Sequence, residues 1–541
     1  MENTAEVTKT TEEFQFEIST LQNEYAALKQ DHAELQAKYE WLLEQIRLSK
    51  QKLYGRKREA VQTENQISMM ELFAELFNEP EVLVEENAQL EPTVEEIQVS
   101  YKRKKYPGQR TDILEGLPVE RIDYELPENE RICEACGNSI HEMSIEVTRQ
   151  LKIVPAQVVV VEHVRHIYSC RNCENTGTSA TIAKAPMPKP TIPHSIASES
   201  AIAYVITQKY QFGLPLYRQE QQWKMLGIQI SRQTMANWVI DSSERWLTLI
   251  YNRMRQYLLE RDIIHADESV LQVLKEPGRP ATSNSYMWLY RTGRDGPPII
   301  LFNYQTTHAS KHPTTFLSGF KGYLNTDGYA GYNNLPDVIN IACFCHARRK
   351  FVDALKAMPK NTSGKPCAAE EGLAFCDKLF EIERSLKDKS DKERYKERLK
   401  TSKPILDKFY EWLKYQKPRV TPKSSLGVAV NYCLNLWEKL TGFLKDGRLE
   451  IHNNRSERSI KSFVIGRKGF LFANTPKGAT ASAVAYSIVE TAKENGLKPF
   501  EYLSYILAAL PNLDFNDQTT LDSILPWSTE LPDHCRLKPT M

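Results

Sequence analysis

Long hydrophobic runs are missing from this 541-residue sequence. No stretch approaches the roughly 18 apolar residues that a membrane-spanning helix needs, and the valines at 158–161 are followed directly by Glu162. The first residues, MENTAEVTKTTEEF, lack the basic and apolar segments of a secretory signal. We therefore expect a cytoplasmic protein with no membrane partner, and the length indicates roughly three or four domains.

An excess of charge of either sign is also missing, because 70 lysines and arginines are balanced by 69 acids. This balance argues against a uniformly basic nucleic-acid-binding protein. The charges are nevertheless unevenly distributed: 45–60 and 102–110 are basic, whereas 71–96 holds nine Glu and no basic residue. Basic segments beside an acidic tract can bind phosphate, or can be ordinary solvated surface. Among them, we expect DNA contacts from Arg56, Lys57 and Arg58.

Cysteine is too sparse for a disulfide scaffold, with ten residues in the chain. Four of them form two CxxC pairs, Cys133/Cys136 and Cys170/Cys173, which are separated by 33 residues. Two such pairs at loop tips can present four thiolates to a tetrahedral zinc ion, and the β-branched segment between them can supply strands. We therefore predict one structural Zn²⁺ in a small module, and four cysteines leave no open position for catalysis at that ion.

A heptad pattern is present near the start of the chain. The positions of one register are Phe14, Leu21, Leu28, Leu35 and Leu42. Leucine at this register favours a parallel two-stranded coiled coil, whereas Tyr25, His32 and Tyr39 in the other register are larger or more polar than that geometry prefers. We predict a coiled coil that mediates self-association; the alternative is an amphipathic helix packed on its own domain.

Residues 196–255 carry the pattern of a helical region with a helix-turn-helix-like pair. One helix is expected at 215–222, a turn at 226–228, and Ser231 is expected to cap the second helix. The side chains then placed to face a DNA groove are Arg232, Gln233 and Asn237. An ordinary helical hairpin has the same pattern.

Two aspartates follow apolar runs in a region of short, strand-like segments. Asp267 follows 261–266, Asp327 ends a later run, and strands are expected between them at 285–291 and 298–304. A third acid, Glu457, lies in the helix-like segment NNRSERSIK. Two carboxylates from neighbouring strand ends and one from a helix can hold two Mg²⁺ or Mn²⁺ ions that activate water or a 3′-hydroxyl.

The residues alone do not single out Glu457, because Glu450 is a nearby alternative. Basic residues surround Glu457 in the sequence, which is typical of a site that receives phosphates, although a solvated basic helix face has the same pattern. The residues near Glu457 that we expect to contact DNA are Arg458, Lys461, Arg467 and Lys468.

The segment CFCHARRKF offers Cys343, Cys345 and His346 as a possible metal cluster, but the spacing is poor and no partner pair is close in sequence. We interpret the cysteines as small buried residues at a strand end. His346, Arg348 and Arg349 are then expected to begin a helix near the active site, with the arginines available to DNA. The charged sequence that follows is expected to be helical to about residue 445, and 452–510 is expected to return to helix with a glycine-rich turn at 466–478.

Motifs along nearly the whole chain, in the same order, resemble the large transposase of insertion-sequence family 66. They are KLYGRKRE, ICEACG with YSCRNC, LPLYRQEQQWKMLGIQISRQTMANWV, HADES, TDGYAGYN, CHARRKF, NNRSERSIK, GRKGFLFANTPKGA and SIVETAKENGLKPFEYL. This chain departs from the family at Lys461-Ser462, where Arg-Pro is common, and at KGF within GRKGF. These departures affect only the expected DNA contacts near Glu457.

The resemblance implies a ribonuclease-H-like catalytic core with Asp267, Asp327 and Glu457 as an Asp-Asp-Glu triad, interrupted by an α-helical insertion. We therefore expect a multidomain α/β protein. Its expected parts are a coiled coil at 11–55, a charged linker at 56–117, a zinc-ribbon-like module at 118–180, a helix-turn-helix-like DNA-binding region at 196–255, a catalytic core at 260–350 and 448–475, the insertion at 351–447 and a C-terminal helical region at 476–541.

The function that the resemblance implies is Mg²⁺-dependent cleavage of insertion-sequence ends and transfer of their 3′-hydroxyls to target DNA. The expected partners are the terminal inverted repeats, target DNA, a second copy of the chain and accessory proteins of the same element. In the cell the protein would lie on the nucleoid when bound to DNA. The alternatives are a zinc-containing DNA-binding regulator without catalysis and a nuclease of the same core fold that does not join strands.

Overall fold

A computed structural model of the chain describes residues 157–169, 182–357, 366–514 and 519–538. The predicted coiled coil and linker, with Arg56, Lys57 and Arg58, lie outside the described residues. So do the zinc-ligand candidates Cys133, Cys136, Cys170 and Cys173. Within the described ranges, no helix is both long and apolar enough to span a bilayer.

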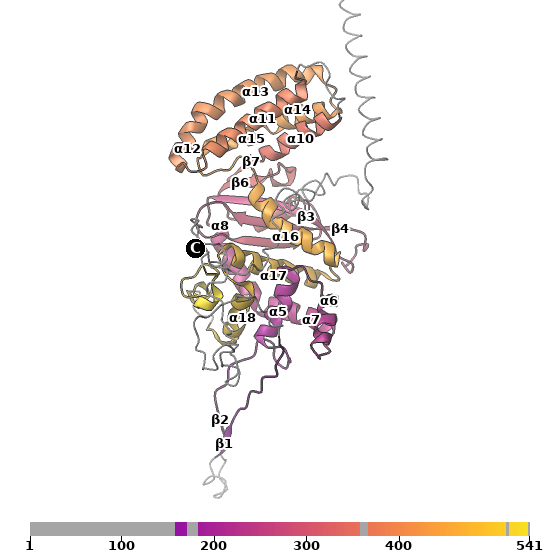
Figure 1. The fold of residues 1–541 in the computed structure, drawn as a ribbon, viewed down its shortest axis with the longest axis vertical. Coiled ribbons are helices and arrows are strands. Elements are labelled where there is room, and N and C mark those ends of the chain that lie inside the picture. The colour runs from indigo at the N-terminus through magenta and orange to yellow at the C-terminus, as the bar shows by residue number, and fades with distance from the viewer. Residues whose placement is uncertain (1–156, 170–181, 358–365, 515–518, 539–541) are drawn as a thin grey trace, which may run out of the picture. The chain divides into compact units, whose positions relative to one another are not determined.

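A five-stranded sheet lies at the centre of the described structure, in the order β5-β4-β3-β6-β7 (Figure 1). Its strands are β3 (Ile263–Gln272), β4 (Asn284–Thr292), β5 (Ile300–Gln305), β6 (Gly322–Thr326) and β7 (Val338–Ala342). The first three form an antiparallel meander, whereas β6 pairs in parallel with both β3 and β7. Apolar side chains such as Leu289, Phe302 and Leu324 are fully buried in this sheet. The strands expected at 285–291 and 298–304 are confirmed as β4 and β5, displaced by one or two residues at their ends.

Helix α17 (Pro476–Glu494) closes one edge of the sheet. The backbone N–H groups of Ile300 and Phe302 on edge strand β5 donate to the hydroxyls of Thr491 (3.0 Å) and Ser487 (2.8 Å). An edge strand whose N–H groups are occupied in this way cannot pair with another chain. Helix α16 (Asn454–Phe470) runs across β3 and β4 (Figure 1).

A helical insertion separates β7 from α16, and its hydrophobic core also includes residues of β3 and β7. Its elements are α10 (Phe344–Ala357), α11 (Ala368–Ser385), α12 (Asp391–Glu397), η4 (Arg398–Ser402), α13 (Lys403–Gln416), η5 (Lys417–Arg419), α14 (Ser425–Asn435), α15 (Trp437–Leu440) and η6 (Thr441–Lys445). Phe351, Phe409 and Phe443 are fully buried members of its core, which is continuous with Ile341 of β7. The helical structure expected from the charged sequence up to about residue 445 is confirmed.

The remaining helices precede the sheet, follow α17, or lie in the connections between β5, β6 and β7. They are α5 (Glu199–Tyr210), α6 (Leu216–Met225), α7 (Arg232–Ser242), η2 (Ser243–Leu247), α8 (Thr248–Leu259), α9 (Lys311–Phe316), η3 (Ala330–Tyr332), α18 (Pro499–Ala509), η7 (Leu510–Asn512), α19 (Thr519–Asp522) and η8 (Asp533–Cys535). A short antiparallel pair, β1 (Ile167–Ser169) and β2 (Ile182–Lys184), precedes them. The expected cap of α7 is confirmed, because the Ser231 hydroxyl accepts from the N–H of Thr234 at 3.1 Å. Between α6 and α7, Gly227 adopts a positive φ of 87°, which glycine tolerates without a side-chain clash.

Two local expectations are wrong. Asp267 does not stand at a strand end, because β3 continues to Gln272 along its long antiparallel partner β4. The glycine-rich turn expected at 466–478 begins later, because α16 continues through Gly466 and Gly469 to Phe470. Glycine at 466 serves close packing instead, since a side chain there would collide with the hydroxyl of Tyr486.

Candidate active site

Asp267 and Asp327 are brought together by the parallel pairing of β3 with β6. The last pair in that ladder is His265 with Asn325, so each aspartate lies two residues beyond it on its own chain. Neighbouring strands are about 4.8 Å apart, which keeps the two aspartates side by side. Asp327 directly follows β6, and its Oδ1 accepts from the N–H of Tyr329 at 2.8 Å.

The start of α16 is fixed against this strand pair by Asn453, a fully buried residue. Its side-chain amide donates to the carbonyl of Ala266 (2.8 Å), and its Oδ1 lies 3.0 Å from Nδ1 of His265. Its backbone N–H donates to the Sγ of Cys343 at 3.1 Å. These contacts attach the first turn of α16, and therefore Glu457, to the residues that precede Asp267 and follow β7.

Glu457 enters the site from the first turn of α16 and meets His346 from the first turns of α10. Its Oε1 lies 3.9 Å from Nδ1 of His346. Both atoms are buried, and neither has a hydrogen-bond partner among the described residues. A buried carboxylate oxygen without a donor is costly, and a bound cation would satisfy it.

Burial and neighbouring acids both disfavour the ionised form of Asp267. Burial raises the pKa of Asp267 well above its usual value, and the charges of Glu268, Asp327 and Glu457 raise it further. The three predicted carboxylates therefore lie close enough to repel one another, and positive charge at this point would stabilise their ionised forms. Although burial alone would lower the pKa of His346, Cys343, Glu457 and Asp327 together raise it.

Sequence reasoning missed the grouping of Cys343, His346 and Glu457. One ligand atom from each lies within 4.8 Å of the others, an arrangement that can hold a metal ion. The CxxH spacing of Cys343 and His346 is visible in the sequence, but their acidic partner is more than a hundred residues away. Cys343 is fully buried, which raises the pKa of its thiol well above the usual value, and its Sγ already accepts a hydrogen bond from Asn453. It therefore fits the predicted role of a small buried residue better than that of a thiolate ligand.

Glu268, the neighbour of Asp267, is a second acid that sequence reasoning missed. It points to the other face of the sheet, as successive residues of a strand do. Its carboxylate oxygens lie 2.8 Å from Nε2 of His308 and accept from the hydroxyl of Tyr332 at 2.7 Å. Both carboxylate oxygens of Glu268 therefore already have partners, His308 and Tyr332, on the face of the sheet opposite Asp267.

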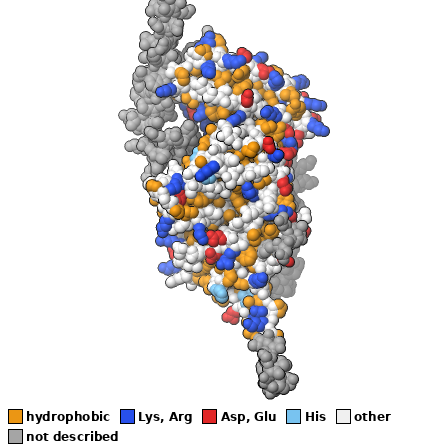
Figure 2. Space-filling model, turned by 180° about the vertical axis from the view of Figure 1, so that it is seen from behind, with side chains coloured by type: hydrophobic (Ala, Val, Ile, Leu, Met, Phe, Trp, Pro, Cys, Tyr) orange, Lys and Arg blue, Asp and Glu red, His pale blue; other side chains and the backbone are white. Residues whose placement is uncertain are grey.

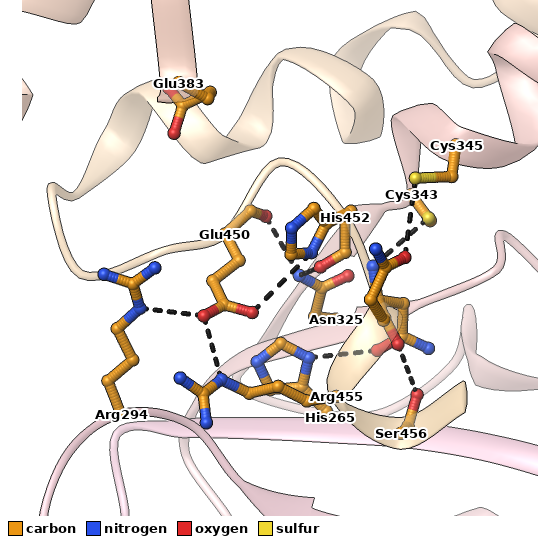
Figure 3. A network of polar contacts seen from close by, with 12 residues as sticks. His265, Arg294, Asn325, Cys343, Cys345, Glu383, Glu450, His452, Arg455 and Ser456 are labelled. Atoms are coloured by element: carbon orange, nitrogen blue, oxygen red, sulfur yellow. Dashed lines mark hydrogen bonds and ion pairs between the residues drawn. The ribbon is translucent and has the colours of Figure 1, made fainter. Parts of the chain in front are cut away.

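Glu450, the alternative third acid, lies in a network of polar contacts that includes Arg294 and Arg455 (Figure 3). Its Oε1 accepts from Nε of Arg294 and from Nε of Arg455, both at 2.8 Å. Burial would raise its pKa, but His265, Arg455 and Arg294 outweigh burial and lower the pKa of Glu450 to about 2. It is 5% exposed and paired with arginines, so it is poorly suited to bind a further cation.

The predicted DNA-contact residues fall into three groups. Arg232, Gln233 and Asn237 are exposed on α7, where the amide of Gln233 donates to Oδ1 of Asn237 at 3.0 Å. Arg458, Lys461, Arg467 and Lys468 share α16 with Glu457; Arg458 and Lys468 are exposed, and the other two are partly buried. Arg348 and Arg349 lie on α10, where Arg348 pairs with Asp377 at 2.6 Å. On the face shown in Figure 2, basic side chains are interspersed with acidic ones and form no single uninterrupted patch. Their DNA contacts stay predictions.

Four family models match four successive segments of the chain. The model described as "Transposase IS66 family" matches 194–481, and the model for the zinc-finger binding domain of transposase IS66 matches 130–174. The model for the IS66 C-terminal element matches 487–527, and one described as "Transposase C of IS166 homeodomain" matches 41–122. The first covers Asp267, Asp327 and Glu457, and the second covers all four cysteines of the CxxC pairs.

The chain is also similar to uncharacterised proteins of Sinorhizobium fredii (strain NBRC 101917 / NGR234). It is 28% identical to protein y4hP over 432 residues, which is 76% of this chain and 75% of that protein. It is 29% identical to protein y4jD over 427 residues, which is 76% of this chain and 80% of that protein.

Proposed function

The chain belongs to the IS66 family of transposases and is a DNA transposase; we propose that Asp267, Asp327 and Glu457 are the residues through which it cuts and joins DNA. The observation that supports this assignment best is the convergence of three acids for which the described residues provide no ion pair with arginine or lysine. The charges of Asp327 and Glu457 both act on Asp267, and Glu457 keeps a buried oxygen without a hydrogen-bond partner among the described residues.

The residues at this point fit a pair of divalent cations. Mg²⁺ and Mn²⁺ prefer oxygen ligands, and three carboxylates supply them from two strands and one helix. Asp267 and Asp327 would hold the ions, and Glu457 would complete the coordination. When bound, the ions supply Lewis-acid activation of the attacking oxygen and stabilise charge on the leaving oxygen.

The chemistry would proceed in two balanced steps at one site. First, water attacks the phosphodiester at the element end; a new P–O bond forms, the bond to the 3′-oxygen breaks, and a 3′-hydroxyl and a 5′-phosphate are released. In the second step that 3′-hydroxyl attacks a target phosphodiester, the new strand junction forms, and the target's own 3′-oxygen leaves as a hydroxyl. Asn453 would act as a positioning residue, because it holds α16, and therefore Glu457, against β3.

The proposal extends to the other parts of the chain. The sheet order, with an antiparallel meander followed by two parallel strands, supports a ribonuclease-H-like core. The zinc-finger match supports one Zn²⁺ bound by Cys133, Cys136, Cys170 and Cys173. The capped α7 supports recognition of the terminal repeats by Arg232, Gln233 and Asn237. Self-association would proceed through 11–55, so that two element ends are handled together.

The experiment that tests the assignment is Asp267→Asn in the full chain. We expect Mg²⁺-dependent cleavage of an element-end duplex to fall at least about 10³-fold, since metal coordination is worth several kcal/mol at the transition state. Binding of the same duplex should be retained. Full cleavage by this variant would exclude Asp267 from the chemistry. A separate assay with pre-cut ends that carry a 3′-hydroxyl distinguishes joining from hydrolysis alone, because a nuclease would give no joined product.

A further inference from the structure

A basic cleft of about 360 Å³ lies between the helical insertion and α16. Its lining comes from α11, α12, the β4–β5 connection and the residues around the start of α16. The lysine and arginine residues that line it are Arg294, Arg384, Lys387, Arg394, Arg455 and Arg458. Arg458 directly follows Glu457, so the cleft borders the helix turn that carries the proposed catalytic acid.

The two acids of this cleft are already paired. Glu450 accepts from Arg294 and Arg455, and Glu383, which stands across from Glu450 in Figure 3, receives two hydrogen bonds of 2.7 Å from Arg398. Three cations at the cleft are exposed and have no ion pair with any residue that the structure describes. They are Arg384, Lys387 and Arg458. The cleft therefore has an excess of positive charge that the described residues do not neutralise.

The buried wall of the cleft also carries positive charge that is not fully paired. It can be seen by comparing Arg394 with Arg398, four residues later. Arg398 is fully buried, and its guanidinium donates to Glu383 and to the carbonyls of Phe443 (3.0 Å), Asp446 (3.1 Å) and Leu449 (2.8 Å). Arg394 is 3% exposed and reaches only Glu383, at 3.5 Å. Its Nε and Nη1 are buried without a hydrogen-bond partner among the described residues.

An unsatisfied buried guanidinium is expensive, and such a group signals a missing anionic ligand. Burial lowers the pKa of Arg394, and so do the neighbouring charges of Arg398 and Arg294. An anion seated beside Arg394 would reverse this repulsion. The planar fork of arginine matches the oxygens of a phosphate, and lysine adds a mobile positive charge at the rim.

We propose that this cleft binds a backbone phosphate of duplex DNA, with Arg394 at its wall and Arg384, Lys387 and Arg458 at its rim. The inference rests on the proposed function, because Arg458 adjoins Glu457 and a strand engaged there would continue into the cleft. Arg384 and Lys387 belong to the insertion, whereas Arg458 belongs to the catalytic core. A phosphate held between them would tie the insertion to the DNA during cleavage or joining.

The test compares the salt dependence of DNA binding in full-length variants. In Arg384→Gln/Lys387→Gln, the magnitude of the slope of log K against log[salt] should fall by about 1, because the loss of one phosphate contact releases about one counterion fewer. Affinity near physiological salt should fall about tenfold. The matched control is Lys408→Gln/Lys414→Gln, which removes the same charge from exposed positions of α13 outside the cleft and should keep the wild-type slope.

Two duplexes distinguish the source of the phosphate: one carrying an element end and one random-sequence target. A reduced slope on either duplex, or on both, supports the cleft and identifies which DNA enters it. Slopes equal to wild type on both would overturn the proposal. Cleavage by the wild-type preparation is measured in parallel, so a failure of the proposed catalytic function is seen separately from a failure of the cleft.

Arg394→Met and Arg398→Met separate a ligand role from a structural one. We expect Arg394→Met to keep the wild-type thermal midpoint while its DNA affinity falls about tenfold, because it removes a charge with few partners in the free protein. Arg398→Met should lower the midpoint, because it leaves Glu383 and three carbonyls without their donor. An Arg394→Met protein that melts early like Arg398→Met, or that keeps full DNA affinity, would contradict the assignment.

Discussion

Glu450 is buried and Glu457, seven residues later, is partly buried, and the two acids differ in whether arginines pair with them. The side chain of Glu450 is 5% exposed and is held by two arginines, which keep its pKa near 2. The side chain of Glu457 is 14% exposed, and its one ionic contact among the described residues is His346 at 3.9 Å. Its charge adds to those that repel Asp267. The comparison teaches that burial alone does not identify a functional acid. The presence or absence of basic partners identifies it instead. An acid paired with arginines stabilises the fold, whereas an acid without such a pair, close to other acids, is suited to bind a cation.

The largest expected effect separates the two acids by activity. Glu457→Gln should reduce Mg²⁺-dependent cleavage of an element-end duplex about 10³-fold, because it would remove a metal ligand. Glu450→Gln should retain most of the activity of whatever fraction is folded. Cleavage rates per folded molecule, with folding checked by circular dichroism, measure this difference. Equal losses in the two variants would break the comparison.

The next effect is on stability, and here Glu450→Gln should show the larger loss and Glu457→Gln the smaller. Glu450→Gln should lower the free energy of unfolding by about 3 kcal/mol, because the drop in the pKa of Glu450 from 4.5 to about 2 measures the stabilisation of its ionised form. Glu457→Gln should not destabilise, since it relieves repulsion on Asp267. Denaturant unfolding followed by tryptophan fluorescence, in the absence of divalent ions, compares the two. A marked loss of stability in Glu457→Gln, with none in Glu450→Gln, would show that Glu457 and not Glu450 stabilises the fold.

The smallest effect is the pH dependence of the Glu450 contribution. Because the pKa of Glu450 is lowered in the folded protein, its stabilisation is complete above its ordinary pKa of 4.5 and is lost as the pH falls towards about 2. The stability gap between wild type and Glu450→Gln should therefore be constant from pH 7 to about pH 5.5 and shrink to less than about half by pH 3. A gap that widens as the pH falls would show that the carboxylate is not the stabilising form.

Much of the fold could be predicted from the sequence because the relevant signals are local. The strands at 284–292 and 300–305 follow from short apolar runs, and the cap at Ser231 follows from its side chain and position. Asp267 and Asp327 were identified because each follows an apolar run. Their juxtaposition depends on the parallel register of β3 and β6.

The rest depends on contacts between distant parts of the chain. Glu457 could not be chosen over Glu450 from the residues alone, because the choice depends on Arg294 from the β4–β5 connection and on Asn453 bonding to β3. The extent of β3 was missed because its pairing with β4 extends it past Asp267. The unsatisfied state of Arg394 likewise depends on Arg398 occupying Glu383, which no pattern of charges in the sequence reveals.

The most direct test of the central claim is a change of metal preference in Asp267→Cys. A thiolate at this position binds Mg²⁺ poorly and softer divalent ions better. If Asp267 coordinates the catalytic ions, joining of pre-cut element ends by Asp267→Cys should be lost in Mg²⁺ and partly restored in Mn²⁺. The wild type should be active in both. Joining by Asp267→Cys at the wild-type rate in Mg²⁺, or its complete loss in both ions, would contradict direct coordination by this residue.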